Sequence, residues 1–225
     1  MLNHTALLNL LQLASPTLPV GSYSYSEGLE ALVDSEIINN QDQFSLWLEN
    51  EVTYGAIRIE TAVMLRSYDC LSKSDLAGLN SWNSWLSAAR ETKELRQQSW
   101  QMGQSLLELL ISLQPSLQFL KDVIEDECNY AIAFGIAASY WQINVEATTI
   151  GYLYSWLNNT INSGVKLIPL GQTTGQKLLF KFRPLIVKTT EEIFALSDEE
   201  LASCSWGLAL ASMEHETQYS RLFRS

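Results

Sequence analysis

The stretch Tyr130-Ala-Ile-Ala-Phe-Gly-Ile-Ala-Ala-Ser-Tyr-Trp141 decides the fold. Small and apolar residues fill nearly every position, so the stretch offers no polar face to water. A helix that is apolar all round is buried inside a protein. We therefore predict that residues 130–141 form the central helix of a helical bundle.

The segments before this stretch predict amphipathic helices. Apolar residues recur every three or four positions over residues 40–67, after a capping box of Asn40 and Gln43, and again over residues 75–113. Gly103 is expected to weaken the second of these helices or to permit a close helix crossing. Shorter helices are predicted over residues 7–13 and 26–33, with an irregular Ser- and Tyr-rich loop between them.

The segments after residue 141 continue the helical pattern. We predict a helix over residues 145–163, a bend over 165–171, and a further helix from about residue 172 to Pro184. A second capping box, Ser197 with Glu200, predicts the start of a final helix. Its apolar face would carry Leu201, Cys204, Leu208 and Ala211.

Composition supports an all-helical fold. Five Pro and eleven Gly are too few for a sandwich or barrel with many turns, and alternating strand patterns are hard to find. We predict an all-α protein whose residues 1–225 form one domain. The expected architecture is a bundle of about seven to ten helices with a flexible C-terminal tail.

Charge and hydropathy exclude several classes of partner. Twenty-five acidic and fourteen basic side chains give a net charge of -11, which would repel a nucleic acid backbone. No segment approaches the roughly 20 apolar residues of a membrane helix, and the N-terminus lacks a signal-peptide pattern. The expected location is the cytoplasm.

Cys70, Cys128 and Cys204 are expected to be reduced, buried thiols.

The sequence shows no assembled catalytic or cofactor motif. The run from Gly171 to Lys177 has three residues between its glycines, whereas a phosphate-binding loop needs four and a following Ser or Thr. His4 and His215 are the only imidazoles, and no nucleophile elbow is present. We therefore predict a protein that is not an enzyme, with no cofactor and no resident metal.

Two charged segments remain to be explained. Residues 90–96 carry Arg90, Glu91, Lys93, Glu94 and Arg96, which on charge alone predict a solvated helix face. Residues 214–225 form a polar end that lacks an apolar stripe, so we expect them to become ordered against a partner protein. Within that end, the side chains of Glu214, His215 and Glu216 cannot all face one metal ion, because consecutive residues of a helix point in different directions. A shared or bridging nickel contact remains an alternative for these residues.

Four blocks of sequence resemble the UreF family of urease accessory proteins. They are Leu11 to Glu30, Ala89 to Gly103, Pro169 to Gln176 and Glu214 to Ser225. The resemblance implies an all-α, often dimeric adaptor that binds the accessory protein UreD, also called UreH, and recruits the GTPase UreG. That complex would dock on apo-urease and support GTP-dependent nickel insertion. The alternative is a metallochaperone that binds nickel directly.

The matched blocks point to partner-binding surfaces. We assign the Ser- and Tyr-rich loop and the 90–96 segment to partner contacts, and the tail to UreD. The candidate partner-binding residues are Tyr25, Glu30, Arg90, Glu94, Arg96, Gln172, Gln176, Gln218, Tyr219, Arg221, Phe223 and Arg224.

Overall fold

A computed structural model describes residues 3–202 and 205–225, and it is all-α, with no strand in those residues. Cys204, which we placed on the final helix, lies outside the described residues. The helices are α1 (His4–Leu13), α2 (Leu29–Asp34), α3 (Gln41–Tyr54), α4 (Ala56–Ser72), α5 (Leu76–Ala89), α6 (Lys93–Leu113), α7 (Leu120–Val123), α8 (Tyr130–Tyr140), α9 (Val145–Leu167), α10 (Gln172–Phe194) and α11 (Trp206–Thr217). Single 3-10 turns cover Ser22–Ser24, Pro115–Leu117 and Asp198–Glu200.

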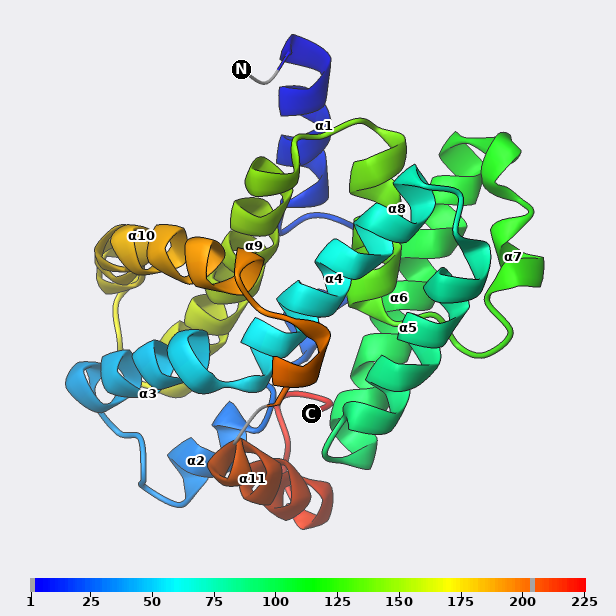
Figure 1. Ribbon diagram of the computed structural model, residues 1–225. Coiled ribbons are helices and arrows are strands. Elements are labelled where there is room, and N and C mark those ends of the chain that lie inside the picture. The colour runs from blue at the N-terminus through cyan, green and yellow to red at the C-terminus, as the bar shows by residue number, and fades with distance from the viewer. Residues whose placement is uncertain (1–2, 203–204) are drawn as a thin grey trace.

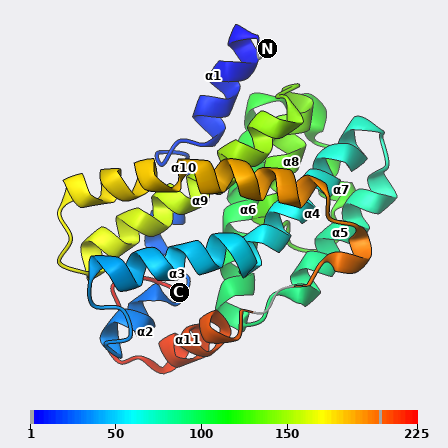
Figure 2. The same ribbon diagram turned by 60° about the vertical axis from the view of Figure 1, so that its left-hand side comes forward.

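Helix α8 is the predicted central helix, and every residue from Ala131 to Ala138 is buried. Helices α4 and α6 pack against it, while α9 and α10 pack against each other on the other side of α4 (Figure 1). Helix α1 projects from one end of this bundle, and α2 and α11 lie together at the opposite end (Figure 2). The all-helical prediction and the position of its central helix are confirmed.

Gly103 marks the close crossing of α6 and α8. A Cβ atom at this position would overlap the backbone of Cys128 and Asn129, just before α8 begins. Only glycine lets the two backbones approach this closely. The sequence-based expectation of a close crossing is therefore confirmed.

Each of the two long helices predicted before residue 113 is divided in two, so those predictions are wrong in extent. Gly55 has an extended backbone with ψ 179°, and it separates α3 from α4. Residues 90–92 separate α5 from α6, and the Thr92 side chain caps α6 by accepting the Leu95 N–H. The sequence does not reveal either break, because the helices on both sides of it face the same core and the apolar spacing therefore continues across it.

Two downstream boundaries also differ from the sequence-based predictions. Helix α10 continues ten residues beyond Pro184, because buried residues on both sides of the proline hold it against the bundle. The capping box of Ser197 and Glu200 is confirmed, but it opens only a 3-10 turn, and α11 begins later, at Trp206. Leu201 therefore precedes the final helix.

None of the helices in the described part of the chain has the length and apolar character that crossing a membrane requires. Cys70 and Cys128 are free, buried thiols, and burial raises the pKa of both.

Candidate partner-docking surface

The C-terminal tail, residues 218–225, folds back onto its own chain through Glu30 of α2. The Glu30 carboxylate accepts the backbone N–H groups of Leu222, at 2.6 Å, and Phe223, at 2.9 Å. The Phe223 side chain is buried, and the Lys166 ammonium lies 5.3 Å from the centre of its ring. The structure thus gives the tail an intramolecular partner, where sequence reasoning expected only another protein.

The last residues of the tail pair with the Ser- and Tyr-rich loop. The Ser225 carbonyl oxygen accepts hydrogen bonds from the Ser26 backbone N–H at 2.7 Å and the Ser26 hydroxyl at 2.6 Å. The Arg224 N–H donates to the Ser24 carbonyl at 2.8 Å, and the Ser225 hydroxyl donates to Gln98 Oε1 at 2.6 Å. Residues from three of the four matched blocks, Leu11 to Glu30, Ala89 to Gly103 and Glu214 to Ser225, therefore meet here.

His215 of α11 lies beneath the tail and is fully buried. Its Nδ1 is 2.9 Å from Glu94 Oε2, and its Nε2 is 3.3 Å from Glu30 Oε2. Arg221 donates to the second oxygen of Glu94 at 3.0 Å. His215, Glu30, Glu94 and Arg221, which we call the tail cluster, thus join α2, α6, α11 and the tail.

Three apolar side chains of α11 are exposed along one face of the helix. Trp206, Leu210 and Met213 recur at helical spacing and are 75%, 60% and 51% exposed. In the tail that follows, Tyr219 and Leu222 are exposed as well. We call these five residues the apolar docking stripe.

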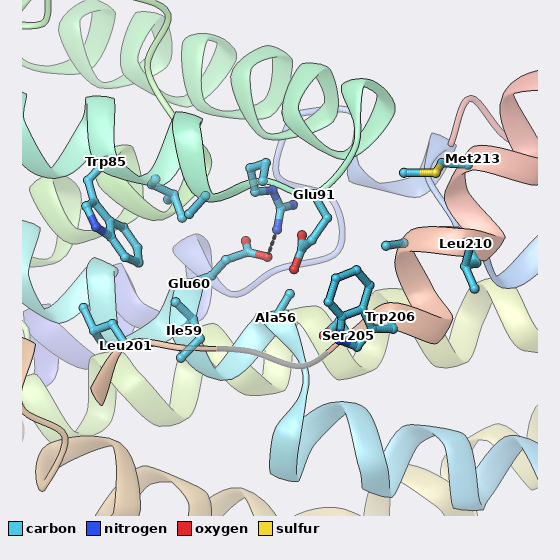
Figure 3. A pocket seen from close by; sticks show the side chains of 14 residues that line it. Ala56, Ile59, Glu60, Trp85, Glu91, Leu201, Ser205, Trp206, Leu210 and Met213 are labelled. Atoms are coloured by element: carbon cyan, nitrogen blue, oxygen red, sulfur yellow. Dashed lines mark hydrogen bonds and ion pairs between the residues drawn. The ribbon is translucent and has the colours of Figure 1, made fainter. Parts of the chain in front are cut away.

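A cavity of about 520 Å³ lies between α4, α5 and α11, and Trp206, Leu210 and Met213 of the docking stripe form part of its lining. Figure 3 shows Trp85 of α5 and Trp206 of α11 on opposite sides of it, with the carboxylates of Glu60 and Glu91 between them. Its wall is mostly apolar, so it suits an apolar side chain of a partner.

Arg90 is buried in the floor of this cavity and forms an ion pair with Glu60. The Tyr152 hydroxyl donates to Glu60 at 3.4 Å, and Arg90 donates to the Leu95 carbonyl at 3.4 Å. Burial raises the pKa of Glu60 to about 7, and the charge of Arg90 opposes that rise. The expectation of a solvated face is therefore wrong for Arg90, which occupies the break between α5 and α6.

The other charged residues of the 90–96 segment are more accessible than Arg90. The Glu94 side chain is 12% exposed and belongs to the tail cluster. Arg96 is partly exposed, and its guanidinium lies 5.9 Å from the centre of the Trp100 ring. Lys93 is exposed as well, so two cations of this segment, Lys93 and Arg96, remain within reach of a partner.

The remaining candidate residues are spread over several surfaces. Tyr25 is buried, and its hydroxyl donates to Gln101. Gln172 and Gln176 are exposed on the first turns of α10, which follows helix α9 and so lacks the strand that precedes a phosphate-binding loop. Gln218 Oε1 is buried with no hydrogen-bond partner among the described residues.

Sequence reasoning missed His215 as an organising residue, along with Glu60 and Trp206. Their roles depend on contacts between distant segments, such as the 185 positions that separate Glu30 from His215. In residues 3–202 and 205–225, no three His, Cys, Asp or Glu side chains are placed to hold a metal ion. Both ring nitrogens of His215 already face carboxylates.

Comparison with known proteins identifies the family. The family model for UreF matches residues 38–183. A protein of Nostoc sp., named urease accessory protein UreF, is 59% identical over 218 residues, which cover 97% of this chain and 95% of the relative. Relatives of the same name from Microcystis aeruginosa, at 57%, and Synechocystis sp., at 50%, are matched over the full length of both chains. This chain therefore belongs to the UreF family of urease accessory proteins.

Proposed function

We propose that the protein is a non-catalytic adaptor in the cytoplasm for maturation of the urease nickel centre. It bridges UreD, also called UreH, and the GTPase UreG on apo-urease, and it modulates GTP-dependent nickel insertion. Its relatives carry the name urease accessory protein. The observation that carries the proposal is the apolar docking stripe, which continues from α11 into the tail.

UreD is the partner that we assign to the docking stripe and the adjoining cavity. Large aromatic and apolar side chains supply most of the binding energy in protein interfaces. Here Trp206 and Leu210 are exposed and line a cavity with room for a partner side chain, and Tyr219 is exposed in the tail. The intramolecular contacts of the tail hold this surface in one shape before binding, which lowers the entropic cost of association.

UreG is the partner that we assign to the accessible residues of the other matched blocks. Arg96, Gln172 and Gln176 retain exposure, so their polar groups are free to contact another protein. Arg90 and Tyr25 are buried, and we propose that they act by holding the 90–92 break and the Ser- and Tyr-rich loop in place. A homodimer is part of this proposal.

Co-expression with UreD and UreG followed by size-exclusion chromatography tests the proposal. The double variant Trp206→Ala and Leu210→Ala is expected to bind UreD roughly 10- to 100-fold more weakly, because two interface anchors are truncated. Phe180→Ala on α10 is the matched control, since Phe180 is 67% exposed and lies outside the docking stripe. Unchanged UreD affinity of the double variant would remove the stripe from the interface.

The UreG assignment has a separate test. Arg96→Glu is expected to weaken recruitment of UreG while UreD still co-elutes, because the reversed charge lies outside the docking stripe. Lys121→Glu on α7 is the control for the same change of charge, because Lys121 is exposed and lies outside the residues assigned to UreG. Full UreG recruitment by Arg96→Glu would overturn this assignment, and failure of wild-type protein to co-elute with either partner would overturn the adaptor function.

A further inference from the structure

The cavity between α4, α5 and α11 has charged groups in its lining as well as an apolar wall. The rings of Trp85 and Trp206 stand on opposite sides of it, and the carboxylates of Glu60 and Glu91 lie between them (Figure 3). Among the described residues, Arg90 is the only cation in this lining, and it is already paired with Glu60. Two carboxylates and one guanidinium leave the lining with an excess of negative charge.

The negative charge of Glu91 acts on two buried carboxyl groups. Burial, followed by the charges of Glu27 and Glu91, raises the pKa of Glu51 to about 7. Burial raises the pKa of Glu60 too, and the charges of Glu27 and Glu91 add to that rise. A cation bound beside Glu91 would offset this repulsion between carboxylates.

Ser205, the residue before α11, adds a polar group to the lining of the same cavity. Its hydroxyl oxygen is buried and has no hydrogen-bond partner among the described residues. A buried polar group without a partner costs free energy. A ligand that donates a hydrogen bond to this hydroxyl would remove that cost.

A guanidinium group matches these features of the cavity. It binds to the faces of aromatic rings, and in this protein the guanidinium of Arg66 lies 5.3 Å from the centre of the Trp82 ring. Its five N–H donors are enough for a carboxylate and a hydroxyl together. Because a carboxylate has about four acceptor sites, Glu91 can accept from it while keeping the contacts that it already makes. The apolar stem of an arginine would pack on apolar wall residues such as Leu201 and Met213.

We propose that this cavity holds an arginine side chain of UreD, with the guanidinium between the two tryptophan rings and donating to Glu91 and Ser205. The identity of the partner rests on the proposed function, but the preference of the cavity for a guanidinium does not. An apolar wall alone would accept any apolar side chain, and the carboxylate narrows that choice to a cationic one. A positive group on the partner also complements a chain with a net charge of -11.

The preference for a guanidinium can be tested on the isolated protein with N-acetylarginine amide as the probe. The indole N–H signals of Trp85 and Trp206, identified with the variants Trp85→Phe and Trp206→Phe, report binding by NMR. We expect both signals to shift, with a dissociation constant on the order of 1 mM for so small a ligand. N-acetylcitrulline amide has nearly the same shape without the charge, and it should bind at least about 10-fold more weakly. Equal binding of the two probes, or no shift with the arginine probe at about 20 mM, would overturn the proposal.

Glu91→Gln tests the carboxylate separately from the apolar wall. The substitution keeps the size of the side chain and removes its charge, so the affinities for the arginine probe and for UreD should both fall roughly 10-fold. Glu191→Gln on α10 removes an exposed carboxylate outside the cavity and is the matched control. Circular dichroism checks that both variants stay folded. Equal UreD affinity of the two variants would overturn the assignment of the cavity to UreD.

Replacing each arginine of UreD with alanine identifies the one that enters the cavity. The losses of affinity caused by that replacement and by Glu91→Gln should not add, because each removes the same contact. Additive losses for every arginine would overturn the pairing. Absence of UreD binding by the wild-type protein would refute the adaptor function, whereas the probe titration would still decide whether the cavity holds a guanidinium.

Discussion

Glu30 and Phe223 are 193 positions apart in the sequence, yet the Glu30 carboxylate accepts the Phe223 N–H at 2.9 Å. The same carboxylate accepts the neighbouring Leu222 N–H and contacts His215. One acidic side chain near the start of the chain thus fixes the backbone of the tail.

Glu30→Ala should release the tail without unfolding the bundle. The substitution removes the acceptor of two backbone N–H groups, and each such loss costs about 1–3 kcal/mol when the donor stays buried. Hydrogen exchange at Leu222 and Phe223 should accelerate, while the helical circular dichroism signal is retained. Glu191→Ala on α10 removes an exposed carboxylate and serves as the control. Unchanged exchange in Glu30→Ala would contradict the role of Glu30.

Arg90→Met should destabilise the whole protein, because it leaves Glu60 buried without its cation. Breaking a buried ion pair from one side typically costs about 3–5 kcal/mol. The double variant Arg90→Met with Glu60→Gln should recover part of this loss, since it removes the unpaired charge. Urea denaturation measures both changes, and equal stability of the single and double variants would show that the ion pair is not the cause.

Glu51→Gln should make the protein more stable at pH 8 but not at pH 5. Burial, followed by the negative charges of Glu27 and Glu91, raises the pKa of Glu51 from 4.5 to about 7. The folded state therefore holds a proton that the unfolded state has lost, and stability falls as pH rises from about 4.5 to 7. A rise of that size corresponds to about 3 kcal/mol.

Urea denaturation at the two pH values measures the effect of Glu51→Gln. Glu49→Gln on the exposed side of the same helix is the control, and its stability should follow that of the wild type. A pH profile shared by Glu51→Gln and wild type would show that Glu51 does not produce the loss of stability.

Gly103→Ala and Gly207→Ala should shift stability in opposite directions. A methyl group at Gly103 would meet the backbone of Cys128 and Asn129, and such overpacking costs about 1–3 kcal/mol. Around Gly207, on α11, nothing among the described residues lies within 4 Å of an added Cβ. There, alanine should add up to about 1 kcal/mol through its higher helix propensity. Thermal unfolding of both variants checks the pair, and a tolerated Gly103→Ala would disprove the close crossing.

The sequence predicts helices well where local signals dominate. The uninterrupted apolar character of α8 and the caps at Asn40 and Ser197 depend on neighbours within a few positions, so they appear in the sequence. At the break over residues 90–92, by contrast, Arg90 pairs with Glu60, which lies thirty positions away in the sequence. Charge spacing alone made that segment resemble an exposed helix face.

The candidate surface could be predicted only in part. The matched blocks located the loop and the tail, and Tyr219 has the exposure expected of a partner contact. Phe223 and Glu30 were also identified, but as contacts to another protein, because an irregular segment carries no periodic signal of what it packs against. Backbone N–H groups bound by a distant carboxylate leave no pattern in the sequence.

The contact between Ser26 and Ser225, 199 positions apart, also sets an order of events during synthesis. Ser26 is synthesised early, and its hydrogen bonds to Ser225 cannot form until residue 225 has also left the ribosome. A nascent chain can therefore assemble its central helices before its docking surface exists. Partners that recognise the docked tail would select chains synthesised at least as far as Ser225 over shorter ones.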